Sequence, residues 1–348
     1  MSKRRLRALA ALALLFVMYL SDNRGLLVRA KKFGAPVAVK DPARTGRMAT
    51  THAMGNPSSL HMLKSKLRDF YTLTKPEVNL LILMTTSAGY YLASCGPMRV
   101  VGLINTLVGT LLVASGTATL NQWLERIWDG QMRRTASRPL PAGRLTAREA
   151  FCFGMLLSIA GGLYLAVAVN ALAALLATST LLSYLLIYTP LKRKTPLCTL
   201  LGAFPGAMPT LIGWAGASAG INRNAWLLFG ILFLWQFPHF LAIALMYRDD
   251  YARAGYRMLP RFDLESRFTR AEIFGFTIML IIATMLPLAS RGGTIYMMAV
   301  FFAGCYMLYH VANLMKSPST VLARKVVHAS VLYLPVVLAM MMVYKAPK

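Results

Sequence analysis

The chain has 348 residues, of which 57% are hydrophobic and only 14% charged, and its formal net charge is +26. A soluble domain carries about 25% charged residues, so this composition excludes an ordinary soluble protein. The apolar residues fall in blocks of about 20, the length at which a helix crosses a bilayer with its backbone groups satisfied internally. We therefore expect an all-α integral membrane protein.

The first 70 residues are predicted to form a basic extension that is largely disordered and lies outside the core. MSKRRLRALAALALLFVMYLSDN joins a basic start to an apolar run of about 13 residues, which is short for a span and typical of a targeting signal. Lysine and arginine continue to Arg47, which also suits a mitochondrial presequence, whereas a start at Met48 or Met54 would leave the membrane domain whole. Residues 71–348 are expected to form that domain.

Nine apolar spans follow in chain order and predict one bundle of nine transmembrane helices. They cover approximately 77–96, 101–121, 149–169, 171–190, 197–217, 225–246, 272–289, 294–315 and 325–344. Lysine and arginine gather in the connections after the even-numbered spans, whereas the opposite connections hold little beyond Arg99, Arg223 and Arg291. Under the positive-inside rule the N-terminus lies on the cytosolic or matrix side of a bacterial or mitochondrial inner membrane. The basic loops account for the net charge without nucleic-acid binding.

A first polar motif, NQWLERIWDGQMRRTASRPLPAG, occupies residues 121–143 at the end of the second span. Asn121, Glu125 and Asp129 are spaced four apart, so on a helix they form one stripe. Oxygen ligands of this kind suit Mg²⁺, which is typically held by one or two carboxylates and substrate phosphates. The arginines that follow match phosphate oxygens; they are Arg133, Arg134 and Arg138. The motif predicts a diphosphate site, with an ordinary polar loop as the alternative.

A second polar motif, WQFPHFLAIALMYRDDYARAGYRMLP, occupies residues 235–260 at the end of the sixth span. Asp249 and Asp250 are followed by Arg253, as the carboxylates of the first motif are followed by arginines. "RPLP" at 138–141 and "RMLP" at 257–260 suggest a weak internal repeat. We expect the two acidic sites to face one another and to share the metal ions of one diphosphate; a solvated helix end is the alternative.

Three long segments resemble the signature segments of the protoheme IX farnesyltransferases, the heme O synthase branch of the intramembrane aromatic prenyltransferases. They are NQWLERIWDGQMRRTASRPLP, YTPLKRKTPLCTLLGAFPGAMPTLIGWA and WQFPHFLAIALMYRDDYARAGYRMLP. The likeness runs from about Thr74 to Tyr344. It implies a nine-helix bundle with a Mg²⁺-binding diphosphate site near one membrane face. It also implies farnesyl diphosphate and heme b as substrates, and a heme O product used by heme–copper oxidases.

The resemblance assigns roles residue by residue. Asn121, Glu125 and Asp129 match the first Asp-rich motif, with glutamate where many members have aspartate, and the second motif is matched by Asp249 and Asp250. These five are the expected metal ligands and catalytic residues. The expected diphosphate contacts are Arg133, Arg134, Arg138, Tyr188, Lys192, Arg193 and Arg253. For Lys192 and Arg193 a positive-inside anchor is the alternative.

Heme contacts are predicted at His239, Trp235 and His310. On a continuous helix, His239 lies nearly on the same face as Asp250 and about 16 Å away along the axis. Imidazole is a common iron ligand, and polar residues inside a bilayer are functional candidates by default. Ordinary packing is the alternative for each of the three.

Two other functions are alternatives to heme farnesylation. A related prenyltransferase with an aromatic acceptor, such as 4-hydroxybenzoate, would share the metal site but would not need the WQFPHF segment. A transporter or channel commonly has ionisable residues near the middle of the membrane, whereas the span centres of this chain are almost free of charge. The sequence therefore favours a heme-prenylating enzyme.

Overall fold

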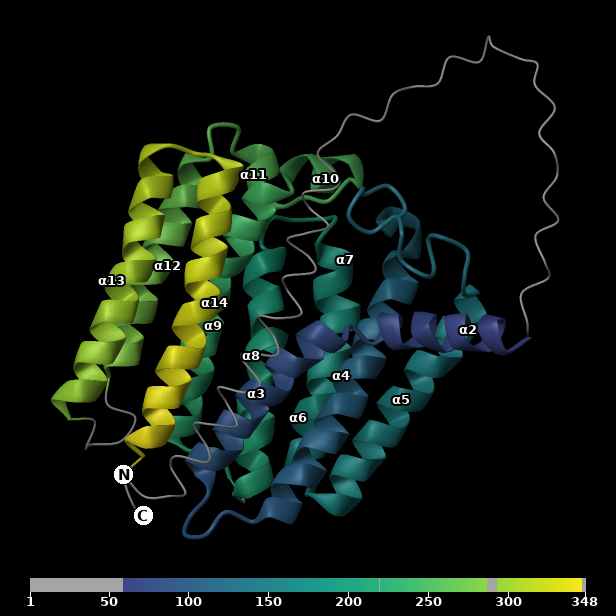
Figure 1. The fold of residues 1–348 in the computed structure, drawn as a ribbon, viewed down its shortest axis with the longest axis horizontal. Coiled ribbons are helices and arrows are strands. Elements are labelled where there is room, and N and C mark those ends of the chain that lie inside the picture. The colour runs from purple at the N-terminus through teal and green to yellow at the C-terminus, as the bar shows by residue number, and fades with distance from the viewer. Residues whose placement is uncertain (1–58, 219, 287–292, 346–348) are drawn as a thin grey trace.

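The computed structural model describes residues 59–218, 220–286 and 293–345, and every regular element in these ranges is a helix (Figure 1). The prediction of a targeting segment falls on residues that lie outside the described part. In chain order the helices are α2 (Ser59–Leu73), α3 (Pro76–Ala93), α4 (Val100–Asp129), α5 (Ala147–Ala168), α6 (Ala171–Leu182), η1 (Ser183–Tyr188), α7 (Thr189–Leu191), α8 (Cys198–Ala217), α9 (Arg223–Met246), α10 (Arg248–Arg253), α11 (Leu259–Phe262), α12 (Arg267–Met285), α13 (Thr294–Lys316) and α14 (Thr320–Val343).

The long helices run side by side as one bundle, which confirms the prediction of an all-α membrane protein. Within the described ranges, eight helices are long and apolar enough to cross a membrane, the fourth predicted span being made of α6, η1 and α7 together. The first predicted span is α3, which has 18 residues and contains Glu77 and Asn79 near its start. Glu77 and Asn79 lower its hydropathy, and half of its residues are buried within the protein.

Small residues let the polar helix α3 pack tightly into the bundle. A Cβ added to Gly213 of α8 would collide with the carbonyl oxygen of Thr86, and one added to Gly89 would collide with the carbonyl oxygen of Thr210. The two backbones therefore touch directly, an arrangement that small residues allow in membrane helix pairs. The contact joins the second half of α3 to the second half of α8.

The predicted boundary at residue 70 falls inside α2, so the described end of the extension belongs with the bundle. Phe70 packs edge-on against Phe153 of α5, with ring centroids 5.0 Å apart. Arg144 Nε donates to Asp69 Oδ1 at 3.0 Å. Residues 59–70 are helical because they pack against α5 and the loop before it, a contact that hydropathy does not reveal.

Two departures from regular helix lie at the end that carries the acidic motifs. η1 is a π-helical turn. Such turns are rare in proteins, but those that do occur often lie at functional sites. Tyr247 has φ −113° and ψ 26°, which ends α9 and separates it from α10. His239 and Asp250 therefore lie on separate helices, so the spacing expected for a continuous helix does not apply to them.

Candidate active site

The first acidic motif lies on an uninterrupted helix. α4 runs for 30 residues to Asp129, beyond the predicted end of its span, so Asn121, Glu125 and Asp129 stand one turn apart. All three are buried, and Asn121 Nδ2 donates to Glu125 Oε2 at 2.7 Å. The three side chains of the motif are therefore held on the helix and away from solvent.

Glu125 is the centre of the charge cluster. Lys192 Nζ donates to Glu125 Oε1 at 2.9 Å, and the Tyr256 hydroxyl donates to the same oxygen at 3.0 Å. Burial alone would lower the pKa of Lys192, but Glu125 and the surrounding tyrosines raise it well above its ordinary value. Lys192 is therefore a permanent cation 67 residues away in sequence from the carboxylate that it contacts.

Asp129 is held by the basic segment that follows it. Arg138 Nη1 donates to Asp129 Oδ2 at 2.6 Å, and the Thr135 hydroxyl donates to the Asp129 carbonyl at 2.7 Å. The loop after α4 thus folds back onto the helix end, and Arg138 reaches the acidic stripe. Arg133 is exposed and makes no ion pair within the described ranges.

The second acidic motif reaches the first through its tyrosines. Asp250 pairs with Arg253 of its own short helix, and Asp249 is exposed without a bonded partner in the described chain. Arg134 lies 5.1 Å from the Tyr247 ring centroid and 5.8 Å from that of Tyr251. The carboxylates of the two motifs are not bonded to one another in the described part of the chain.

The turn η1 arranges the aromatic and basic residues of the YTPLKR segment. Lys192 lies 4.4 Å from the Tyr188 ring centroid, and Arg193 lies 4.1 Å from the Trp128 ring centroid. Gly202 of α8 makes room for Tyr188, because an added Cβ would stand 2.5 Å from that ring. Both predicted cations therefore point at α4, which favours a role in the site over a simple membrane anchor.

Tyr256 is a site residue that sequence reasoning missed. It lies in the loop after α10, is 2% exposed, and reaches Glu125 across 131 residues of sequence. Burial and the Glu125 carboxylate both raise its pKa, so the hydroxyl stays protonated and can donate. Arg257 N–H also donates to the Lys192 carbonyl at 2.7 Å. The loop of the second motif therefore contacts both members of the Glu125–Lys192 ion pair.

Lys75 is a second residue that sequence reasoning missed. It stands between α2 and α3 with a left-handed backbone, φ 51° and ψ 63°, which is uncommon outside glycine. Gln122 Nε2 donates to the Leu73 carbonyl at 2.8 Å, and Asn79 Nδ2 donates to the Thr74 carbonyl at 2.9 Å. These two amides hold the strained junction, and strain of this kind clusters at functional sites.

The Lys75 ammonium lies among the charges of the acidic site but pairs with none of them. Burial lowers its pKa to about 7, and the positive charge of Arg138 adds to the lowering. The carboxylates of Glu125 and Asp129 act in the opposite direction. The Lys75 ammonium makes no hydrogen bond or ion pair within the described residues, so its charge is available to an anionic ligand.

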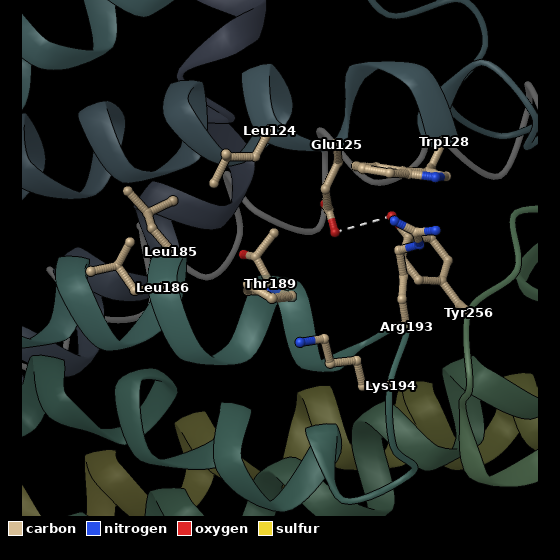
Figure 2. A pocket seen from close by; sticks show the side chains of 10 residues that line it. Leu124, Glu125, Trp128, Leu185, Leu186, Thr189, Arg193, Lys194 and Tyr256 are labelled. Atoms are coloured by element: carbon tan, nitrogen blue, oxygen red, sulfur yellow. Dashed lines mark hydrogen bonds between the residues drawn. The ribbon is translucent and has the colours of Figure 1, made fainter.

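A cavity of about 460 Å³ opens beside Glu125 (Figure 2). Its lining has a polar end and an apolar end: Glu125, Trp128, Arg193, Lys194 and Tyr256 on one side, and Leu124, Leu185 and Leu186 on the other. Figure 2 shows Glu125 bonded to Tyr256 at the polar end, with the leucines of α4 and η1 beyond. Such a lining suits a ligand that joins an anionic head to an apolar chain.

The side chains that could hold a metal ion through their oxygens are those of the stripe on α4. The described ranges hold no group of three or more His, Cys, Asp or Glu side chains that could bind a metal by themselves. Mg²⁺ usually keeps water and takes one or two carboxylates together with substrate phosphates. Asn121, Glu125 and Asp129 fit that pattern, in which the substrate completes the site.

The predicted heme contacts lie elsewhere in the bundle. Trp235 and His239 stack on one face of α9, with ring centroids 4.6 Å apart and planes 19° apart. Ser330 of α14 lies 2.8 Å from His239 Nδ1, and the Trp235 indole donates to the Ser330 carbonyl at 2.7 Å. Binding through Nδ1 leaves Nε2 as the nitrogen that could face a ligand. His310 packs edge-on against Tyr306 of α13, and its Nδ1 is buried without a partner in the described residues.

Comparison with known proteins identifies relatives along most of the chain. The model of the UbiA prenyltransferase family matches residues 82–337. The protoheme IX farnesyltransferase of Solibacter usitatus is 46% identical over 286 residues, which are 79% of this chain and 98% of the relative. That of Koribacter versatilis is 43% identical over 290 residues, 80% of this chain and 93% of the relative.

Solved structures share the fold at low sequence identity. A digeranylgeranylglyceryl phosphate synthase superposes with a TM-score of 0.67 at 19% identity, covering 81% of this chain and 99% of that one. A UbiA homolog from Archaeoglobus fulgidus bound to DMAPP and Mg²⁺ superposes with a TM-score of 0.54 at 14% identity, covering 78% and 99%. These likenesses establish the architecture.

Proposed function

The chain belongs to the UbiA prenyltransferase family, and from this premise we propose that it transfers a farnesyl group from farnesyl diphosphate to a vinyl group of heme b. The observation that carries the proposal is that Glu125 of the first acidic motif contacts both Lys192 of the YTPLKR segment and Tyr256 of the second acidic motif. The name of the relatives, protoheme IX farnesyltransferase, is the basis for proposing heme b as the acceptor and a farnesyl donor. Water is added in the same reaction, so the product is heme O.

The diphosphate binds at the polar end of the cavity. Arginine forks and lysine ammonium groups match phosphate oxygens. We assign this role to Arg138, Lys192 and Arg193, which reach α4, and to Arg133, Arg134, Tyr188 and Arg253 around them. Lys75 joins the set because its charge has no bonded partner in the described chain. The leucines of the cavity suit the first part of the farnesyl chain.

The charged residues stabilise the departing diphosphate. The allylic C–O bond breaks, the electron pair leaves with the diphosphate, and a delocalised farnesyl cation forms. Mg²⁺, proposed at Asn121, Glu125 and Asp129 with help from Asp249 and Asp250, would neutralise negative charge on the leaving group. Lysine and arginine supply the same kind of stabilisation from the other side, so the negative charge that develops in the transition state meets fixed cations.

The acceptor reacts through its vinyl group. The vinyl π electrons form a C–C bond to the farnesyl cation, and water adds to the carbon cation that remains next to the porphyrin. A proton is released, which leaves a hydroxyl-bearing farnesyl chain on the ring. We assign His239, with Trp235 beside it, to contact the heme, and His310 as a further contact. The His239–Ser330 hydrogen bond fixes the imidazole in one orientation.

The protein is an integral membrane protein, and we propose an orientation and a route for its product. The basic loops place the acidic site on the cytosolic or matrix side of a bacterial or mitochondrial inner membrane. Both substrates are amphipathic and can enter from the bilayer. Heme O would then serve the assembly of heme–copper oxidases, as the resemblance implies.

Mass analysis of the hemes tests this function. The purified protein, reconstituted in lipid, is incubated with heme b, farnesyl diphosphate and Mg²⁺, and with EDTA in a parallel sample. We expect heme carrying a hydroxylated farnesyl chain with Mg²⁺ and none with EDTA. Prenylation of 4-hydroxybenzoate in place of heme would show that the acceptor is wrongly assigned.

Asp129→Asn tests the site in the same assay. It keeps the shape and hydrogen-bonding oxygen of the side chain but removes the charge, so turnover should fall at least 100-fold, or about 2.7 kcal/mol. Glu265→Gln, at an exposed position of the loop before α12, is the matched control and should keep full activity. Full activity in Asp129→Asn would exclude this carboxylate from metal and diphosphate binding.

A further inference from the structure

Helix α2 carries an apolar stripe that no described residue covers. Leu60, Leu63, Leu67 and Tyr71 are 58%, 55%, 59% and 63% exposed. At about 100° per residue they fall within an arc of about 80° on the helix surface. They therefore form one continuous face of three turns, while a further exposed apolar side chain, Met62, lies on the other side of the helix.

The opposite side of α2 is the one that the protein holds. Asp69 and Leu73 are buried, at about 160° and about 120° from the middle of the stripe. Lys66 pairs with Glu149 at the start of α5 (2.5 Å), and Gln122 of α4 binds the Leu73 carbonyl. Because these contacts fix the rotation of the helix, the apolar stripe must point away from the bundle.

The position of α2 relative to the spans identifies what the stripe meets. Figure 1 shows α2 lying across the upright helices, and its contacts are with the start of α5 and the last turns of α4. Those are the ends of membrane spans, on the side that carries the acidic site. A helix that lies across span ends with one apolar face matches the arrangement of interfacial helices.

Positive charge follows one edge of the stripe. Lys64 and Arg68 are exposed, are one turn apart, and make no ion pair within the described residues. They lie next to the apolar face and away from the buried side. At a membrane surface, such side chains extend toward lipid phosphates while their stems cover apolar area.

We propose that α2 is an interfacial helix, with its apolar stripe in the acyl-chain boundary of the leaflet next to the acidic site and with anionic lipid phosphates at Lys64 and Arg68. The helix leads through the clamped Leu73 carbonyl directly into Lys75. The lipid surface therefore helps to set the junction from which Lys75 enters the site. This inference stands apart from the identity of the prenyl acceptor.

Collision measurements on single nitroxides test the proposal. The four native cysteines are replaced, and single cysteines for labelling are placed at Leu63, Leu67 and Ser65 of the full chain in phosphatidylglycerol nanodiscs. Labels at 63 and 67 should be accessible to oxygen, protected from a water-soluble nickel complex, and about 5–10 Å below the phosphates. The label at the exposed polar position 65 should show the reverse pattern.

Two results would overturn the proposal. Equal nickel accessibility at all three positions would put α2 in water, and protection from both reagents at 63 and 67 would mean that protein covers the stripe. The double variant Lys64→Glu and Arg68→Glu should move the label at 63 toward the headgroups in phosphatidylglycerol but not in phosphatidylcholine. An unchanged depth would remove the anionic lipid from the proposal. None of these readouts depends on enzyme activity.

Discussion

Lys75→Met should stabilise the protein while it damages catalysis. Folding lowers the pKa of Lys75 from 10.5 to about 7, so protonation of this lysine opposes folding. At about 1.36 kcal/mol per pKa unit, this lowering of the pKa costs the folded state at most about 5 kcal/mol of stability. Solvent at this half-buried position screens the effect, and we expect a gain of about 1–2 kcal/mol. Catalytic efficiency should fall about 10- to 100-fold, the value of a hydrogen bond to a charged group.

The sign of the pH dependence separates this effect from improved packing. Below pH 7 the lysine is protonated in both the folded and the unfolded chain, and the loss of stability caused by the buried charge is at its maximum. Between pH 7 and 10.5 the folded protein holds the neutral amine while the unfolded chain keeps its proton. The loss of stability therefore decreases as the pH rises through this range. The gain from Lys75→Met should therefore be smaller at pH 9 than at pH 6.

Thermal unfolding in detergent at the two pH values measures this gain. The midpoint should rise by about 2–8 °C at pH 6 and by less at pH 9. Lys316→Met, at an exposed position at the end of α13, removes the same charge and should leave the midpoint unchanged at both values. An equal gain at pH 6 and pH 9 would refute the electrostatic reasoning, as would no gain at pH 6.

Two further variants probe the site and the heme contact. Tyr256→Phe removes a hydrogen bond to a buried carboxylate, so kcat/KM should fall about 10- to 100-fold. The control is Tyr251→Phe, which removes a hydroxyl 3.5 Å from Arg134 and should lower kcat/KM less than about threefold. Equal losses in the two variants would show that the Tyr256 hydroxyl has no special role. His239→Ala should weaken heme binding, followed by absorption titration, without changing the affinity for farnesyl diphosphate, and an unchanged heme spectrum would remove His239 from the acceptor site.

Features that depend on local pattern were predictable from the sequence. The spans follow from blocks of apolar residues, and the stripe of Asn121, Glu125 and Asp129 follows from the helical repeat, which the Asn121–Glu125 hydrogen bond confirms. The apolar length of α3 was recognised although Glu77 and Asn79 make it polar for a span. Patterns of this kind are encoded within one or two turns of chain.

Features that depend on distant contacts could not be predicted. Tyr256 acquires its partner across 131 residues, and a tyrosine in a loop carries no mark of that contact. Lys75 differs from the other lysines through a left-handed backbone that Gln122 and Asn79 impose. The break at Tyr247 likewise interrupts a stretch that reads as a continuous helical pattern. A glycine at 255 was the one local sign that the chain turns near Tyr256.

The π-helical turn η1 holds one extra residue in the span without rotating the segment that follows it. A π-helix bonds residues five apart and turns less per residue than an α-helix, so its six residues cover nearly the rotation of about five α-helical ones. Deleting a single residue between Ser183 and Tyr188 would therefore let a regular helix replace the turn while Lys192 keeps its direction toward Glu125. Deleting a residue from the regular helix α6 instead would rotate the following segment by about 100° and turn Lys192 away from Glu125. The wide turn is thus a place where the length of the span can change by one residue without loss of the site.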